Sequence, residues 1–223
     1  MNHYFVDTNI IFSYSHKFET THDLSNKLLS RTRVYASKIS FDEVNAVRNT
    51  RDNIYSQFAR VVKQAAIPER DLFKEDVLFR LVSDIIKTNR HYSHLEDVFR
   101  YILKITSSET KTKKTLVKYF RRVIRDITQN IETALDILKP PISIVGDVEL
   151  ETQIAKFITP ETDRKIVSEA AYWFQNNISA GRNNHFVTND AEHILSQKSN
   201  LIRIVDGYFS NNFKFRLEHI RDT

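Results

Sequence analysis

In the first fifty residues, segments with the hydrophobic pattern of a strand alternate with segments that have the pattern of a helix. Short β-prone apolar runs at 3–6 and 34–39 predict strands, because their residues are β-branched or aromatic. An apolar series beginning at 10–12, and the segment 23–29, predict helices, and a further helix opens at 40–43. Strands that alternate with helices are typical of a parallel sheet with helical crossovers.

The middle of the chain, residues 45–139, changes to apolar residues spaced three and four apart, which indicates amphipathic helices. Pro68 separates the first two helices, and Pro140 and Pro141 end the last. We predict a helical insert in the first crossover. Its four apolar series are Phe58, Val61, Val62, Ala65; Val77, Leu78, Leu81, Ile85, Ile86; Leu95, Val98, Phe99, Ile102, Leu103; and Leu116, Tyr119, Phe120, Val123, Ile124, Ile127, Ile131, Leu135.

After Pro141 the alternating pattern returns. A helix with proline in a tolerated first-turn position is predicted from 159–160 onward. A strand at 185–188, a short helix at 191–195 and a further strand at 201–205 follow.

These elements predict an α/β fold in which helices flank a central parallel sheet in three layers. The α/β domain would comprise residues 1–50 plus 141–223, and a mostly α-helical insert would comprise 51–140. Composition agrees, because 41% of the 223 residues are hydrophobic, while three glycines and four prolines favour long helices. The chain has no cysteine, which excludes disulfides and thiolate metal sites.

Two of the predicted strands end in acidic residues. The first runs into Asp7-Thr8-Asn9, and the later strand runs into Thr188-Asn189-Asp190. The carboxyl ends of parallel strands lie on one edge of a sheet, where ligands bind. We therefore expect Asp7 and Asp190 to converge if their strands are neighbours.

Two further acids are expected at this edge, each in the first turn of a helix. Glu43 follows the second predicted strand, and Asp163 follows Pro160. Four carboxylates so close would repel one another unless some were protonated or a hard cation neutralised them. Mg²⁺ and Mn²⁺ prefer oxygen ligands, and such ions activate water and stabilise charge on a phosphodiester.

Four short motifs carry a resemblance to the PIN-domain nucleases. The sequence resembles that family over roughly residues 1–50 and 155–210, and the helical middle is far longer than a compact PIN domain has at that place. The motifs are Tyr4-Phe5-Val6-Asp7-Thr8-Asn9-Ile10-Ile11, Ser40-Phe41-Asp42-Glu43-Val44, Thr162-Asp163-Arg164-Lys165-Ile166 and Phe186-Val187-Thr188-Asn189-Asp190.

The resemblance implies a metal-dependent ribonuclease with Mg²⁺ or Mn²⁺ as cofactor and RNA as substrate. The metal-binding and catalytic acids that it implies are Asp7, Glu43, Asp163 and Asp190. The residues that would support them by hydrogen bonding are Asn9, Thr188 and, as a weaker candidate, Asn189.

Each acid also has a structural interpretation. Asp7 could cap the helix that follows it, and Asp163 could favour a helix N-terminus through the dipole. Glu43 could complete a capping box with Ser40, which would leave Asp42 as the alternative metal ligand. Glu169 and Asp206 are interpreted as surface charges, and none of the eight histidines is assigned to metal.

The chain is basic, with a net charge of +5, and one basic run in the insert contains no acid. Such a run could follow a nucleic-acid backbone, or it could be a solvated helix face. We name it the basic run; its residues are Lys111, Lys113, Lys114, Lys118, Arg121, Arg122 and Arg125.

The leading hypothesis is a Mg²⁺- or Mn²⁺-dependent endoribonuclease in which water is the nucleophile. The alternative is a non-catalytic module that binds nucleic acid, or one whose helical insert docks an inhibitor protein or a second copy of the chain. The N-terminus does not have the pattern of a signal peptide, and no window reaches the roughly 18 apolar residues that span a membrane. We expect a soluble, cytoplasmic protein that does not bind membranes.

Overall fold

The computed structural model describes residues 2–64, 77, 80, 93–106, 112–144, 146–177, 184–209 and 213–223. These residues form two compact units. Unit 1 comprises Met1–Asn45 and Ile131–Thr223, and unit 2 comprises Ala46–Asn130. Unit 2 largely coincides with the predicted insert at 51–140, whose status as a separate domain stays a prediction.

Unit 1 is built on a parallel sheet. Its strands are β1 (His3–Val6), β2 (Val34–Tyr35), β3 (Asn184–Thr188) and β4 (Leu217–His219), in the order β2-β1-β3-β4. Every pairing of neighbouring strands is parallel. The predicted α/β class with a central parallel sheet is therefore confirmed, and the strands that carry Asp7 and Asp190 at their ends are direct neighbours.

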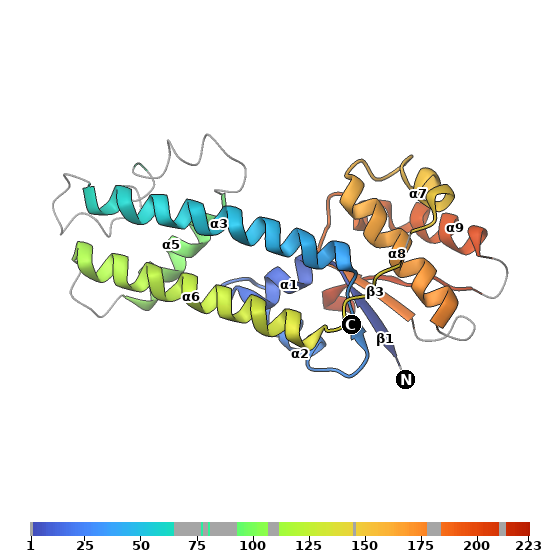
Figure 1. Cartoon of the computed structure of the whole chain (residues 1–223), viewed down its shortest axis with the longest axis horizontal. Coiled ribbons are helices and arrows are strands. Elements are labelled where there is room, and N and C mark those ends of the chain that lie inside the picture. Colours follow the sequence, from blue (N-terminus) through green and yellow to red (C-terminus); the bar gives the residue numbers. More distant parts are fainter. Residues whose placement is uncertain are drawn as a thin grey trace. The chain divides into compact units, whose positions relative to one another are not determined.

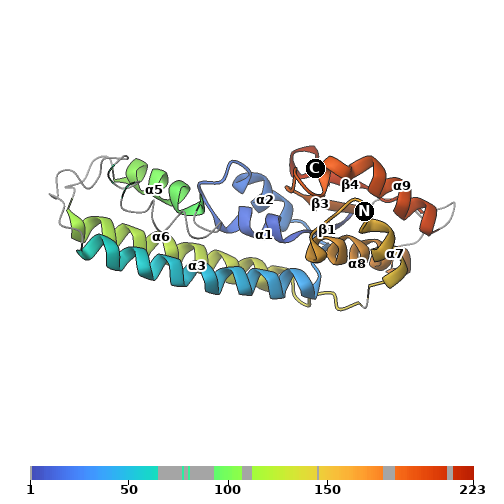
Figure 2. The same ribbon diagram turned by 90° about the horizontal axis from the view of Figure 1, so that it is seen from above.

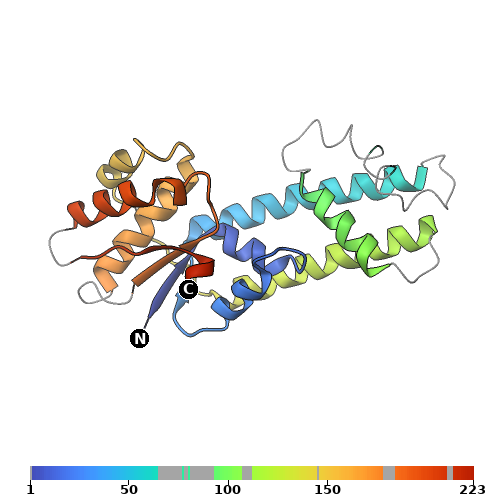
Figure 3. The ribbon, with the colours of Figure 1, turned by 180° about the vertical axis from the view of Figure 1, so that it is seen from behind.

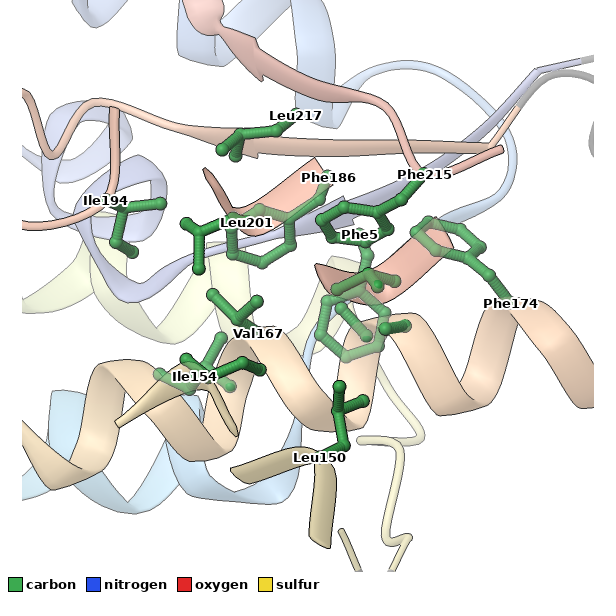
Figure 4. Packing of buried hydrophobic residues seen from close by; sticks show 14 of the residues in the cluster. Phe5, Leu150, Ile154, Val167, Phe174, Phe186, Ile194, Leu201, Phe215 and Leu217 are labelled. Atoms are coloured by element: carbon green, nitrogen blue, oxygen red, sulfur yellow. The ribbon is translucent and has the colours of Figure 1, made fainter. Parts of the chain in front are cut away.

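One face of the sheet is covered by α7 (Val148–Ile154), α8 (Glu161–Asn177) and α9 (Lys198–Tyr208), drawn from yellow-brown to red in Figure 3. Phe5 and Phe186 are register partners on the middle strands and project into this layer. Figure 4 shows them packed among apolar side chains of the three helices. Burial of this cluster holds α8 against the strands, because removal of apolar surface from water is the main stabilising contribution.

The other side of the sheet carries α1 (Thr8–Ser15) and α2 (His22–Leu29). Side chains alternate between the two faces of a strand, so the residues directly before and after Phe5 in β1 point to this second face. Helix α1 contacts both α2 and β3, and its Ile10 and Ile11 are fully buried. This packing places the first turn of α1 at the carboxyl edge of the sheet.

Unit 2 is helical in its described part. Helix α3 (Lys38–Gln64) continues from unit 1 into unit 2, and α6 (Lys113–Ile137) returns the chain to unit 1. Within unit 2 the two helices lie side by side (Figures 1 and 2), and the Phe58 and Phe120 rings are 4.8 Å apart between centroids. Helix α5 (Ser93–Ile105) buries an apolar stripe of its own.

Several predicted elements need correction. The run at 201–205 belongs to helix α9, because Leu201 and Val205 are buried at a spacing of four, whereas a strand would alternate. The predicted helix at 191–195 consists mainly of turn residues, with a 3₁₀ turn at Leu195–Gln197. The predicted strand at 34–39 ends at Tyr35, and α3 begins at Lys38.

The helices predicted from 40–43 and from Phe58 are a single helix, α3, since residues 38–64 contain neither glycine nor proline. Most of the second amphipathic series, from Val77 to Ile86, lies outside the described residues, as does Lys111 of the basic run. In the part of the chain that the structure describes, no helix combines the length and apolar character that a membrane crossing requires.

Candidate metal centre

Asp7 occupies the junction between β1 and α1. It is the N-cap of α1, and its Oδ1 accepts a hydrogen bond from the Thr8 backbone N–H at 2.7 Å. Its Oδ2 accepts from the Thr188 hydroxyl at 2.8 Å and from the Asn9 side-chain amide at 3.1 Å. The capping role considered for Asp7 is therefore real, and it coexists with a position in a carboxylate cluster.

Thr188 connects the ends of the two middle strands. Its hydroxyl donates to Asp7, and the same oxygen accepts from the Asp190 backbone N–H at 2.9 Å. A threonine at the last position of β3 can make both contacts because β1 and β3 are neighbours in register. This side chain fixes the distance between Asp7 and the turn that carries Asp190.

Asp190 organises the turn that follows β3. Its Oδ1 accepts from the backbone N–H groups of Glu192 at 3.0 Å and His193 at 2.8 Å. Its Oδ2 lies 3.2 Å from Nδ1 of the His193 ring. The carboxylate is thus held rigidly at the strand end while 12% of its side chain stays accessible.

Asp163 joins this group from the first turn of α8. Its Oδ2 lies 3.8 Å from His193 Nδ1, and each of Asp163, Asp190 and His193 offers one ligand atom within 4.8 Å of the others. Burial raises the pKa of Asp163 to about 6, and the charges of Asp190 and Glu43 add to that rise. The His193 charge acts in the opposite direction. Glu43 therefore lies within electrostatic range of Asp163.

Glu43 faces the cluster from α3. Its Oε2 accepts a hydrogen bond from the Thr8 hydroxyl at 2.7 Å. The capping box with Ser40 does not form, because Ser37 precedes the helix and its hydroxyl accepts from the Ser40 backbone N–H at 2.9 Å. The alternative acid, Asp42, is exposed and pairs with Lys38 at 2.7 Å.

The four predicted acids therefore form one electrostatic cluster in unit 1. Asp7 is 2% exposed, and its pKa is raised to about 7. Burial is the largest cause, the hydrogen bond from Thr188 opposes it, and the charges of Asp163 and Glu43 raise the pKa further. A buried carboxyl in this state either binds a proton or requires a nearby cation at neutral pH.

His193 is the residue that the sequence interpretation missed. Its side chain is 43% exposed, and the hydrogen bond with Asp190 raises its pKa. The Asp-x-x-His spacing in the turn after β3 is the sequence signal that could have suggested it. Asn189, predicted as a supporting residue, donates instead to the hydroxyls of Ser13 at 2.9 Å and Thr21 at 3.2 Å. It therefore ties the end of β3 to the α1 region.

No protein-family model, no curated protein and no solved structure matches this chain. Function is therefore inferred from the donor set itself. Carboxylate oxygens suit Mg²⁺ and Mn²⁺, and an imidazole nitrogen shifts preference toward the transition metal. A divalent ion of this kind fits two observations. Asp7 is buried and has a raised pKa, and ligand atoms of Asp163, Asp190 and His193 lie close together.

Proposed function

We propose that this protein is a divalent-metal-dependent endoribonuclease. Asp7, Glu43, Asp163 and Asp190 would hold Mg²⁺ or Mn²⁺, with His193 at the exposed side of the cluster. The observation that carries this proposal is the convergence of four acids, the buried Asp7 among them, from four separate segments on the carboxyl edge of the sheet. RNA is the proposed substrate because of the resemblance of the four motifs to PIN-domain nucleases.

The ion, when bound, would activate a water molecule and neutralise charge that develops on the phosphodiester. The residues of the chain have the task of holding the carboxylates in place. Thr188 and Asn9 orient Asp7 through its Oδ2, and Thr8 orients Glu43. Such hydrogen-bonded support fixes a ligand and tunes its basicity, so the loss of a supporting group weakens metal sites about 10- to 100-fold.

Access to the cluster differs between its members. Asp7 is almost fully buried, whereas 16% of the Asp163 side chain and 12% of the Asp190 side chain are accessible. An RNA phosphate would therefore approach from the side of Asp163, Asp190 and His193. Asp7 would contact the ion from the buried side of the cluster, where the low dielectric constant strengthens its interaction with a cation.

The test is cleavage of a 5′-labelled single-stranded RNA in Mn²⁺ or Mg²⁺. We expect Asp7→Asn and Asp190→Asn each to lower the rate by at least about 100-fold, because each removes a charge from the ion site. Asp42→Asn is the matched control, since this exposed acid pairs with Lys38 and lies beside Glu43 in the sequence. Its rate should stay within about twofold of the wild type.

Two results would overturn the proposal. One is full activity of either cluster variant, and the other is undiminished cleavage in excess EDTA. If the folded wild type binds RNA but does not cleave it with any divalent ion, the non-catalytic binding module becomes the better description. Circular dichroism of each variant separates loss of the site from loss of the fold.

A further inference from the structure

A second site lies wholly within unit 2, in a cleft between α3 and α6. Its volume is about 710 Å³, which falls in the range of small-molecule pockets. Lys63 of α3 lines it together with the six described members of the basic run on α6. No acidic residue is among the described residues that line it. We call it the basic cleft.

The cationic side chains share one direction because of their spacing on α6. Lys114, Lys118, Arg121 and Arg125 follow one another at four, three and four residues, so they lie on one face of the helix. All four residues are exposed. A solvated face with mixed charges would show acids at the same spacing, and the described lining of the cleft has none.

The cleft also has an apolar component. Val117 and Tyr119 line it, although they are only 7% and 8% exposed, so they form part of its inner surface. The Lys118 ammonium lies 5.8 Å from the centre of the Tyr119 ring. A site with an aromatic inner surface and a cationic margin has two kinds of recognition, one for flat apolar groups and one for anions.

We propose that the basic cleft binds single-stranded nucleic acid. Phosphates would pair with the lysine and arginine side chains, and a base would lie against Val117 and Tyr119. Arginine suits this use because its planar guanidinium binds phosphate through two hydrogen bonds and stacks on bases. Binding here does not depend on hydrolysis at the carboxylate cluster, so the two activities can fail separately.

The experiment measures binding of a 5′-fluorescein-labelled U12 RNA by fluorescence anisotropy. It uses the full chain carrying Asp7→Asn, in EDTA, so that no cleavage takes place. The test variant adds Lys118→Glu and Arg122→Glu. The control variant adds Arg60→Glu and Lys104→Glu instead, which changes net charge equally at exposed positions of α3 and α5 that are outside the described lining.

We expect the test variant to bind RNA at least about 10-fold more weakly than the parent, and the control variant to bind within about threefold. The dependence of log Kd on log salt concentration should also become shallower in the test variant, by about one and a half, since two phosphate contacts are lost. Equal losses in the two variants would mean that net charge, and not the cleft, attracts RNA, and the proposal would fail.

Competition identifies the occupant. Unlabelled U12 should displace the labelled RNA at a concentration at least about 10-fold lower than inorganic polyphosphate of similar charge, because polyphosphate has no base to place on the apolar surface. Equal competition would overturn the nucleic-acid assignment in favour of general polyanion binding. Stronger competition by poly-glutamate would overturn it in favour of an acidic protein partner. Matching thermal midpoints of all variants exclude loss of the fold as the cause.

Discussion

Two buried carboxyl groups, those of Asp7 and Glu169, have a pKa raised to about 7. The surroundings that raise the pKa differ between the two. Asp7 belongs to the carboxylate cluster, where the charges of Asp163 and Glu43 add to the effect of burial. Glu169 lies on α8, is 5% exposed, and is raised mainly by burial, with a hydrogen bond involving Ser37 that acts in the opposite direction. The interpretation of Glu169 as a surface charge is therefore wrong, because the side of α8 that carries it is packed.

Glu169 should make the protein less stable as pH rises. Its pKa in the folded state exceeds the ordinary value of 4.5, so its contribution to stability is fully present below pH 4.5 and is lost as pH rises through about 7. Glu169→Gln should therefore raise the free energy of unfolding by about 1–2 kcal/mol at pH 8 and leave it nearly unchanged at pH 4.5. Urea denaturation at the two pH values measures the difference.

The exposed Glu149→Gln is the matched control for this substitution, and its effect at both pH values should be within about 0.5 kcal/mol. A Glu169→Gln variant that is less stable at pH 8 would contradict the assignment. It would mean that the carboxylate has a charge partner in the folded protein.

At the scale of elements, the start of α3 decides which acid faces the cluster. Ser37 caps this helix, and its hydroxyl also lies 3.1 Å from that of Ser40. If Ser40 had been the cap, Glu43 would have turned back to the helix end. With the cap three residues earlier, Glu43 is free of that role and accepts from Thr8.

The cap can be tested by comparing two alanine substitutions. Ser37→Ala should lower the free energy of unfolding by about 1 kcal/mol or more, because it leaves a helix N–H without its acceptor. Ser40→Ala should cost less, since it removes a contact between two hydroxyls and no cap. Thermal unfolding of both variants shows which substitution costs more stability. A larger loss for Ser40→Ala would show that Ser40, and not Ser37, caps the helix.

The elements also show where the sequence is sufficient for prediction. Strands β1 and β3 are apolar runs that stop at polar residues, so both the strands and their terminal acids were predictable. The segment at 201–205 is rich in branched residues that suit strands, but packing against the core makes it helical. Strand β4 was not predicted, because Leu217–His219 alternates too briefly to give a signal.

Individual site residues follow the same division. Asp7 and Asp190 were predictable from strand ends, whereas the place of His193 depends on a distance to Asp163, which is 30 residues earlier. Prediction of the basic cleft would likewise have required Lys63 to be placed beside the basic run. Lys63 lies about 50 residues before that run and reaches it through the packing of α3 on α6. Contacts between distant segments cannot be read from local periodicity.

At the scale of the whole molecule, the net charge of +5 conceals an uneven distribution. Unit 1 gathers four acids, Asp7 among them, whereas unit 2 gathers seven basic residues around its cleft. Metal binding should therefore change the stability of unit 1 in a pH-dependent manner. On the proposed function, the carboxyl groups must lose their protons before they bind an ion, and the pKa values of Asp163 and Asp7 are about 6 and 7.

We expect 1 mM Mn²⁺ to raise the melting temperature by several degrees at pH 8 and by much less at pH 5.5. Affinity rises as the two carboxyl groups ionise, so the shift should increase between these pH values. Differential scanning fluorimetry measures it, and Asp7→Asn should reduce the shift at pH 8. An equal shift at both pH values would indicate that the ion binds elsewhere.

The hydrogen bonds of Asp7 also limit how it can coordinate an ion. A carboxylate has about four lone-pair directions. Thr188 and Asn9 occupy both directions of Oδ2, and the Thr8 backbone occupies one of Oδ1. A single lone pair on Oδ1 is left, so Asp7 could hold an ion through one oxygen only, and the remaining ligands would have to come from the other acids, His193 and water.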